Sequence, residues 1–248
     1  MSTAPLAQAD RRRIALVTGG VRGIGLACAR ELAGRGDEVW IGWRSSTERA
    51  AALRAEFGER LLRADLAREE QAAGLAAELE RRRGGLDVWV HAVGDFESGP
   101  LEATDAAALQ RLFDSNVSSF HTAWRALAPL LRARRGRVLA FACPGLAGLR
   151  PRRQAAAYAA VKSALCVLVR SLAVEEAARG VTLHLLSPGV VPHDAAHPDT
   201  LATELQQAIP QGRVATPEEI ARCAAWLVSD EARHATGGEL VVSGAWQL

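Results

Sequence analysis

The sequence Ile14-Ala15-Leu16-Val17-Thr18-Gly19-Gly20-Val21-Arg22-Gly23-Ile24-Gly25 decides the fold. Its first part is a short apolar run typical of a buried strand, and a helical pattern over Ile24–Ala33 follows its glycines. Glycines let a backbone turn tightly and approach a phosphate group, while a helix N-terminus offers unpaired N–H groups and a favourable dipole to an anion. Because a strand and a helix flank the turn, the pattern T-G-x-x-x-G-x-G favours a dinucleotide-binding turn over a purely structural one.

Apolar runs and helical patterns alternate along the rest of the chain. The runs that predict strands are Ile14–Thr18, Val39–Trp43, Leu61–Ala64, Val88–Val90, Val138–Phe141, Val181–Leu186 and Glu239–Val242. The patterns that predict helices are Ile24–Ala33, Thr47–Phe57, Arg68–Arg83, Thr104–Leu112, Ser118–Arg134, Ala155–Ala178 and Pro217–Val228. This alternation predicts an α/β fold, a single-domain Rossmann-like doubly wound parallel sheet with helices on both faces. The ligand crevice is expected at the carboxyl ends of the strands.

Size and composition set the domain count. A chain of 248 residues with 49% hydrophobic content can bury one substantial core, and no linker or internal repeat divides it. We therefore expect an N-terminal tail over residues 1–12 and one domain over residues 13–248. The irregular stretch 190–212 is expected to be a substrate-binding loop or lid, since long loops in compact domains are usually functional.

Charge and cysteine content exclude several classes of protein. A formal net charge of +2 is too balanced for a nucleic-acid-binding surface. The stretch before Ile14 lacks the apolar segment of a signal peptide, and no apolar run reaches the roughly 18 residues of a membrane span, so we expect a cytoplasmic protein with no membrane partner. The cysteines lie far apart, which argues against a metal site and a disulfide framework; they are Cys28, Cys143, Cys166 and Cys223.

Three polar residue types each occur only once in the chain. Tyr158 is the only tyrosine, Lys162 the only lysine and Asn116 the only asparagine. Tyr158 and Lys162 stand at positions i and i+4 of a predicted helix, so they lie on one face and can address the same ligand. A tyrosine hydroxyl has a pKa of about 10, and a nearby ammonium group is needed to stabilise its phenolate near neutral pH. The alternative is an amphipathic helix with a packed tyrosine and a solvated lysine.

These motifs resemble the short-chain dehydrogenase/reductase family over nearly the whole chain, and in particular its 3-oxoacyl-(acyl-carrier-protein) reductase branch. The resemblance rests on the glycine spacing, on the three single residues and on further short matches. Those matches are Asp65-Leu66, Tyr158-Ala-Ala-Val-Lys162, Ser187-Pro188-Gly189, Gly212-Arg213 and Pro217-Glu218-Glu219-Ile220.

The resemblance implies an NADPH-dependent oxidoreductase that transfers hydride between NADP(H) and a ketone or alcohol, including a carrier-bound one. Tyr158 would donate the proton, Lys162 would support the phenol and bind the nicotinamide ribose, and Asn116 would hold a water that relays protons. A homotetramer, or a homodimer, is implied through Ser118–Arg134, Ala155–Ala178 and the C-terminal strand. The residues implied at the cofactor are Thr18, Gly19, Arg22, Gly23, Ile24, Gly25, Arg44, Ser45, Asp65, Leu66, His91, Ala92, Gly94, Tyr158, Lys162, Pro188, Gly189 and Val191.

The end of the second predicted strand indicates which cofactor is preferred. An acidic residue there holds the ribose diol of NAD and repels a 2′-phosphate. This chain has Arg44 and Ser45 instead, and Arg22 projects from the glycine turn toward the same region. Arginine pairs with phosphate by charge-assisted hydrogen bonds, so NADP(H) is favoured. The alternative makes both arginines ordinary solvated charges.

The chain departs from the family pattern at the substrate. The family has a serine about thirteen residues before the tyrosine, where it hydrogen-bonds the substrate carbonyl. Counting back from Tyr158 gives Gly145, and counting forward from the fifth strand gives Cys143, so both are candidate substrate contacts. His91 and His193 also replace family residues; they could act in catalysis or touch phosphate, although a lone histidine is more often a packed or surface residue.

Two alternative functions stay open, and the missing serine favours the first of them. The chain could be a catalytically impaired NADP(H)-binding sensor or pathway accessory protein. It could also catalyse a dehydration or an isomerisation on the same scaffold, without net redox chemistry.

Overall fold

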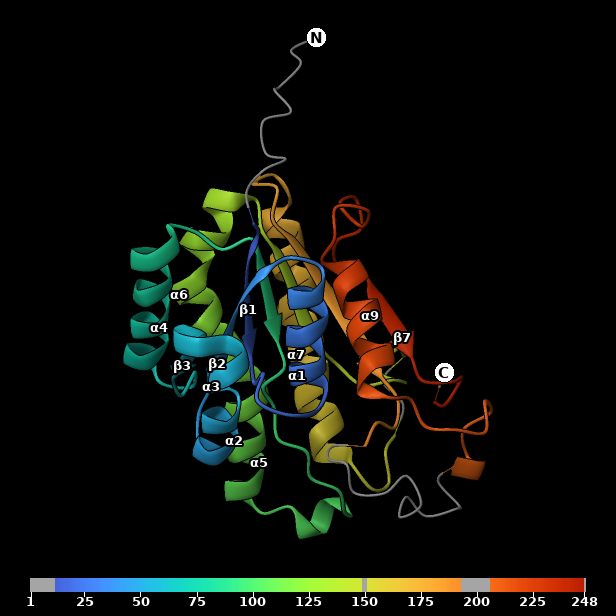
Figure 1. Cartoon of the computed structure of the whole chain (residues 1–248). Helices are drawn as coiled ribbons and strands as arrows, with labels where there is room; N and C mark the ends of the chain where they lie inside the picture. Colours follow the sequence, from blue (N-terminus) through green and yellow to red (C-terminus); the bar gives the residue numbers. More distant parts are fainter. Residues whose placement is uncertain (1–11, 149–150, 193–205, 248) are drawn as a thin grey trace.

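Seven parallel strands form one sheet in the order β3-β2-β1-β4-β5-β6-β7 (Figure 1). The computed structural model describes residues 12–148, 151–192 and 206–247. The strands are β1 Ile14–Thr18, β2 Glu38–Trp43, β3 Leu61–Arg63, β4 Val88–His91, β5 Arg137–Phe141, β6 Thr182–Pro188 and β7 Glu239–Val242. The order reverses between β1 and β4, so the crevice beside the carboxyl end of β1 is where this kind of fold binds its ligand.

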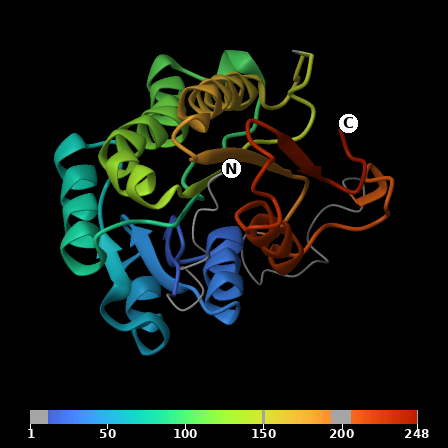
Figure 2. The same ribbon diagram turned by 90° about the horizontal axis from the view of Figure 1, so that it is seen from above.

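Helices cover both faces of this sheet. Figure 2 shows α1 and α9 on one side and the α4, α6 and α7 layer on the other. The helices are α1 Gly23–Gly34, α2 Thr47–Ala52, α3 Arg54–Phe57, α4 Glu69–Arg83, α5 Ala106–Phe113, α6 Ser119–Arg134, α7 Ala156–Ala177 and α9 Pro217–Leu227. Shorter turns are η1 Gly58–Arg60, η2 Leu101–Ala103 and the π-helical turn η3 Asp114–Ser118. The predicted doubly wound α/β fold is confirmed.

The core consists of two apolar clusters, one on each face of the sheet. In β1, Leu16 packs into the cluster under α4, α6 and α7, whereas Val17 packs into the cluster under α1 and α9. Successive side chains of a strand point to opposite faces, so a strand buried on both faces must be apolar along its whole length. This requirement explains why continuous apolar runs in the sequence predicted the strands.

Two segments differ from the predicted elements. The predicted helix Thr47–Phe57 is divided into α2 and α3 at Leu53, whose N–H is shared between the carbonyls of Arg49 and Ala50. The predicted helices on either side of residues 113–117 are joined by η3 instead of being separated by a loop. A π-helical turn inserts one extra residue, and such turns are frequent at functional sites.

The boundaries at the chain ends and in the irregular stretch stay predictions. Residues 1–11, most of the expected tail, and residues 193–205, most of the expected lid, lie outside the described residues. Within the described residues, α7 is long and apolar enough to cross a membrane by length and composition alone. Its Leu165, Val169 and Ala173 are buried against the sheet, which accounts for an apolar helix in a core.

Replacing Arg132 of α6 by alanine is expected to lower the free energy of unfolding by about 1–3 kcal/mol at neutral pH. Arg132 donates two hydrogen bonds, of 2.9 and 2.6 Å, to Glu176, which is only 1% exposed. The hydrogen bonds from Arg132 hold the pKa of Glu176 below its usual value. The pair therefore contributes stability above the unfolded pKa of about 4.3, and this contribution is lost as the pH falls through the lower folded value.

Urea unfolding of Arg132→Ala at neutral and acid pH checks this expectation. The difference from wild type should shrink with acidification. Arg125→Ala on the same helix is the matched control, because Arg125 pairs with the exposed Glu69 and such surface pairs contribute only about 0–1 kcal/mol. An equal loss for both variants would contradict the assignment.

Candidate active site

The glycine turn between β1 and α1 depends on the conformation that glycine allows at position 19. Gly19 has a φ of +78°, and a Cβ at this position would lie 2.7 Å from the carbonyl carbon of Ala92. Its N–H donates to the carbonyl of Gly42 at 2.8 Å, which holds the turn against β2. The first turn of α1 carries neither a side-chain cap nor an acidic residue among the described contacts. Its N–H groups are therefore free to bind an anion.

The residues expected at a 2′-phosphate lie at the same edge of the sheet. β1 and β2 are parallel neighbours with Thr18 opposite Gly42, so Arg22 and Arg44 follow two adjacent strand ends. Both arginines and Ser45 are exposed. The backbone carbonyl of Arg44 accepts a hydrogen bond of 3.1 Å from Arg63, which fixes the loop while leaving the Arg44 guanidinium toward solvent.

Asp65 and Leu66 follow β3 and shape the turn that precedes α4. One Asp65 carboxylate oxygen accepts from the N–H of Ala67 at 3.1 Å, and the Asp65 N–H donates to Gln71 at 2.7 Å. Leu66 is buried in the core cluster. These contacts give both residues a structural role in addition to the expected one at the cofactor.

Asn116 lies in η3 and is completely buried. Its Nδ2 donates to the carbonyls of Asp95 and Leu112 at 3.0 and 2.9 Å, whereas its Oδ1 has no hydrogen-bond partner. Gly94 lies against this amide at a φ of +156°, and any Cβ there would collide with Oδ1 and lie 3.4 Å from Nζ of Lys162. A buried carbonyl oxygen without a partner is a position for a water or a ligand donor, beside the lysine.

Lys162 and Tyr158 lie on α7 beside this amide. Nζ of Lys162 donates to the carbonyl of Phe141 at 2.8 Å and lies 5.6 Å from the centre of the Tyr158 ring. Burial lowers the pKa of Lys162 to about 8. Burial raises the pKa of the Tyr158 hydroxyl above its usual value, with a smaller contribution from Cys143. The phenol therefore keeps its proton, the state that a proton donor requires.

Phe96 was not anticipated from the sequence. Its ring packs edge-on against Tyr158 with the ring centres 4.9 Å apart, although 59% of Phe96 is exposed. An exposed aromatic ring beside the proton donor is suited to an apolar part of a substrate. Sequence alone gave no signal, because Phe96 lies in a loop without periodicity.

The two candidates for the missing serine lie in different surroundings. The half-buried Cys143 lies close enough to Lys162 for the ammonium charge to oppose the effect of burial, which raises the thiol pKa. Gly145 has a φ of +74°, and a Cβ there would lie 2.7 Å from the backbone carbonyl of Gln247. The guanidinium of Arg152 also lies within the space of such a Cβ and donates to the carbonyl of Pro144 at 2.5 Å. Cys143 is therefore the candidate that faces the Tyr158–Lys162 pair.

His91 ends β4 and is buried rather than open to a ligand. Its Nδ1 lies 3.0 Å from Oγ1 of Thr18 and its Nε2 lies 3.3 Å from Oγ of Ser119. Burial, and secondarily the charge of Lys162, lowers its pKa to about 3, so the ring is neutral. Ala92, which follows it, donates from its N–H to the carbonyl of Thr18 at 2.8 Å. His193, the other candidate histidine, lies outside the described residues.

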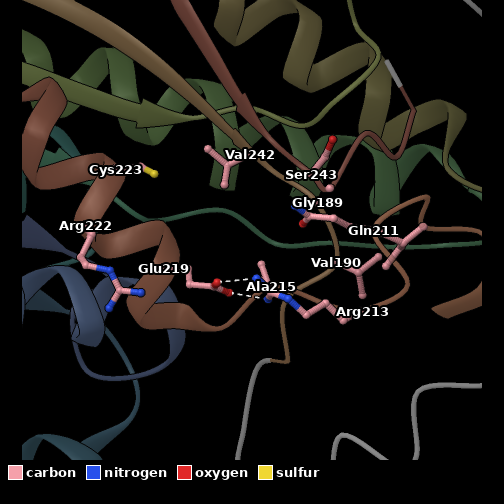
Figure 3. Close-up of a pocket in the computed structure, with 12 residues that line it drawn as sticks. Gly189, Val190, Gln211, Arg213, Ala215, Glu219, Arg222, Cys223, Val242 and Ser243 are labelled. Atoms are coloured by element: carbon pink, nitrogen blue, oxygen red, sulfur yellow. Dashed lines mark hydrogen bonds and ion pairs between the residues drawn. The ribbon is translucent and has the colours of Figure 1, made fainter.

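The Pro188-Gly189 turn after β6 borders a cavity of about 330 Å³ (Figure 3). Val190 and Gln211 line it, as does Ser243, whose buried hydroxyl has no partner. Val191 is buried just beyond the turn. Residues from both ends of the expected 190–212 loop and from the chain after β7 line this cavity together. The sequence gave no indication that these segments lie side by side.

The motif Pro217-Glu218-Glu219-Ile220 has a structural explanation. The Thr216 side chain caps α9, and the Thr216 N–H donates to the carboxylate of Glu219 at 2.9 Å. Arg213 forms an ion pair with Glu219 at 2.7 Å, drawn in Figure 3. This capping box fixes the start of α9 beside the cavity.

Comparisons with known proteins agree with this architecture. A family model described as enoyl-(acyl carrier protein) reductase matches residues 19–246. The chain is 34% identical to an L-fucose dehydrogenase of Bos taurus, with 95% of this chain and 90% of that protein covered. It is 33% identical to a 3-oxoacyl-(acyl-carrier-protein) reductase of Escherichia coli (strain K12), with 95% and 98% covered. A crystal structure of a dehydrogenase/reductase from Sinorhizobium meliloti 1021 matches with a TM-score of 0.86 and 31% identity, covering 95% of each chain.

Proposed function

The chain belongs to the short-chain dehydrogenase/reductase family, and from this premise we propose that it is an NADPH-dependent carbonyl reductase, or the reverse alcohol dehydrogenase. The relatives named above are oxidoreductases, which supports redox chemistry in this chain. One observation carries the proposal furthest. Tyr158, Lys162 and Asn116, each the only residue of its type, come together at the carboxyl edge of the sheet, where Asn116 and Lys162 are buried and Tyr158 is partly buried.

The described residues fit a nicotinamide dinucleotide. Gly19 keeps the turn close against the backbone of Ala92, where a Cβ would collide, and the uncapped start of α1 offers N–H groups to a pyrophosphate. The unpartnered Oδ1 of Asn116 and the ammonium of Lys162 offer polar atoms at the other end of the crevice. These features support binding through Thr18, Gly19, Gly23, Ile24 and Gly25 at the phosphates, and through Lys162 and Tyr158 at the reacting end.

When bound, the reduced nicotinamide supplies hydride to the substrate carbon. Tyr158 donates its hydroxyl proton to the carbonyl oxygen, and burial keeps that proton in place until it is needed. Lys162 places a positive charge beside the resulting phenolate, because its pKa of about 8 leaves it largely protonated at neutral pH. The phenolate of Tyr158 is reprotonated at the expense of the Lys162 ammonium, and Asn116 holds a water at Oδ1 through which the lysine regains its proton.

A turnover assay decides between a carbonyl reductase and the alternative, an NADP(H)-binding sensor without turnover. Purified protein is to be incubated with NADPH and a panel of 3-oxoacyl thioesters and cyclic ketones, and separately with NADP+ and a panel of hydroxy acids and sugars. The absorbance of NADPH falls in the first direction and rises in the second. We expect measurable turnover with at least one ketone or, in reverse, one alcohol. Cys143 in place of serine specifically favours an NADP(H)-binding sensor, since a thiol is a weak hydrogen-bond donor. Tight NADPH binding without turnover on any substrate would favour the sensor.

Arg44→Ala is expected to raise the Kd for NADPH by about 10- to 100-fold with little change in the Kd for NADH, because only NADPH carries the 2′-phosphate. Arg22→Ala should act in the same direction. Titrating both cofactors against protein fluorescence measures the two constants. Arg35→Ala is the control, since Arg35 follows the opposite end of α1 and pairs with Glu31 at 2.8 Å. Equal affinity of the wild type for NADH and NADPH would refute the preference.

We also propose that the protein is a homotetramer, or a homodimer, in which a second copy covers α7. Two valines of α7 are strongly exposed, Val167 at 63% and Val174 at 80%. Exposed apolar side chains seven residues apart lie on one face of a helix, and such side chains are suited to a contact between subunits. Light scattering of the wild type and of Val174→Glu tests this, with a smaller particle expected for the variant.

A further inference from the structure

A chain of buried hydrogen bonds runs from the end of β1 to the π-helical turn η3, and His91 is its centre. On one side, Nδ1 of His91 lies 3.0 Å from Oγ1 of Thr18, the residue before Gly19. On the other, Nε2 lies 3.3 Å from Oγ of Ser119, which in turn lies 2.6 Å from the carbonyl of Ser115, the residue before Asn116. The chain thus joins the phosphate-binding turn to the turn that holds Asn116.

The direction of each hydrogen bond follows from the groups at the two ends. The carbonyl of Ser115 can only accept, so the single hydroxyl hydrogen of Ser119 is used there. Ser119 Oγ must then accept from His91, which places the ring proton on Nε2. Nδ1 of the neutral ring is consequently an acceptor, and its donor is the hydroxyl of Thr18, which lies 3.0 Å from Nδ1 and farther, 3.4 Å, from the carbonyl of Val90. Trp89 Nε1 donates to Thr18 Oγ1 at 3.1 Å, so that oxygen both accepts and donates.

The ring of His91 cannot rotate freely or gain a second proton. Trp89 and Phe120 pack against it edge-on, with ring centres 5.3 and 5.5 Å away. Lys162 is the cation that faces it, and an imidazolium here would lose its hydration and be repelled. A neutral ring of one tautomer is therefore built into the fold.

We propose that His91 is a positioning residue that couples the phosphate-binding turn, through Thr18, to the catalytic turn of Asn116, through Ser119 and Ser115. The Thr18 half fixes the start of the cradle at Gly19, and the Ser119 half fixes the amide whose Oδ1 lies beside Lys162. The inference deepens the proposed function and rests on it for its kinetic consequences. The hydrogen-bond pattern itself stands independently of the activity.

Two isosteric variants separate the halves. The amide of asparagine reaches the position of Nδ1, so His91→Asn keeps an acceptor for Thr18 and loses the donor to Ser119. The longer glutamine reaches the position of Nε2, so His91→Gln keeps the donor to Ser119 and loses the acceptor for Thr18. The loss of one hydrogen bond is expected to change the affected constant, kcat or the Kd for NADPH, by about tenfold. His91→Asn should mainly lower kcat, and His91→Gln should mainly raise the Kd for NADPH.

Two NMR readouts do not depend on turnover. Lys162 is the only lysine, so a protein labelled at lysine reports its titration alone. His91→Asn should shift that titration more than His91→Gln does, because Asn116 moves relative to Nζ. In protein labelled in the histidine ring nitrogens, the wild-type His91 signal should show the Nε2–H tautomer and should not titrate near neutral pH.

His184→Asn is the matched control. His184 of β6 is equally buried, its Nε2 lies 3.3 Å from Oγ1 of Thr182, and burial lowers its pKa to about 4. It contacts neither turn among the described residues. Its replacement should lower Tm while leaving the Kd for NADPH, kcat and the lysine titration at their wild-type values.

The outcomes are distinct. The coupling is supported if His91→Asn changes kcat more than the Kd for NADPH and His91→Gln changes the Kd more than kcat. It is overturned if both variants change only Tm, as His184→Asn does, if both change Kd and kcat alike, or if the histidine spectrum shows the Nδ1–H tautomer. A wild type that binds no NADP(H) but shows the Nε2–H tautomer would refute the proposed function and leave the hydrogen-bond chain intact.

Discussion

Tyr158→Phe is expected to lower kcat by about 10²- to 10⁴-fold, the usual contribution of a positioned general acid. The variant keeps the ring that packs against Phe96 and lies beside Lys162, and removes only the hydroxyl. The Kd for NADPH should stay near its wild-type value, since the phosphate-binding turn is untouched. The loss should therefore fall on kcat and kcat/KM together, as for an interaction made in the transition state.

Steady-state kinetics on the best substrate of the panel measures this loss. Ser163→Ala is a suitable control, because Ser163 lies next to Lys162 on α7 but donates only to the backbone carbonyl of Ala159 at 2.8 Å. Wild-type turnover by Tyr158→Phe would show that another group donates the proton.

Cys143→Ser is expected to raise kcat by up to about a hundredfold. A hydroxyl is a stronger donor than a thiol, and loss of one donor to a developing oxyanion typically costs about 10²- to 10³-fold. Burial raises the pKa of the Cys143 thiol, so the native side chain is a protonated thiol and not a thiolate. Serine occupies less volume than cysteine and fits the same half-buried position.

Gly145→Ser tests the other position at which the family serine could lie. Its φ of +74° and the nearby carbonyl of Gln247 leave no room for a side chain, so this variant should gain no activity and should lose stability. Initial rates with saturating NADPH and thermal unfolding measure the two effects. Faster turnover by Gly145→Ser, or no gain by Cys143→Ser, would contradict the position assigned to Cys143.

Much of the fold was predictable because its determinants are local. Strands such as β1 are apolar along their whole length, and the glycines after Thr18 mark the turn into α1. The spacing of Tyr158 and Lys162 also needed only the geometry of a helix. Such features follow from periodicity and from the conformations open to glycine.

What the sequence did not predict depends on contacts between distant residues. The π-helical turn η3 is held by Asn116 against Asp95 and by Ser119 against His91, and no pattern within 114–118 signals it. The choice between Cys143 and Gly145 depends on Arg152 and Gln247, the latter about a hundred positions away in the chain. Counting residues along the chain therefore gave two candidate positions, because it does not register these distant contacts.

The contact between Gly94 and Asn116 limits how the enzyme could be redesigned. Because Oδ1 of Asn116 occupies the space of any side chain at position 94, mutant libraries that diversify the loop after β4 would yield mostly inactive clones unless they keep this glycine. Diversity is better directed to Phe96, whose exposed ring adjoins Tyr158 without touching the amide cluster among the described contacts. In engineering a new substrate specificity, Gly94 would therefore be kept while other positions of the loop are varied.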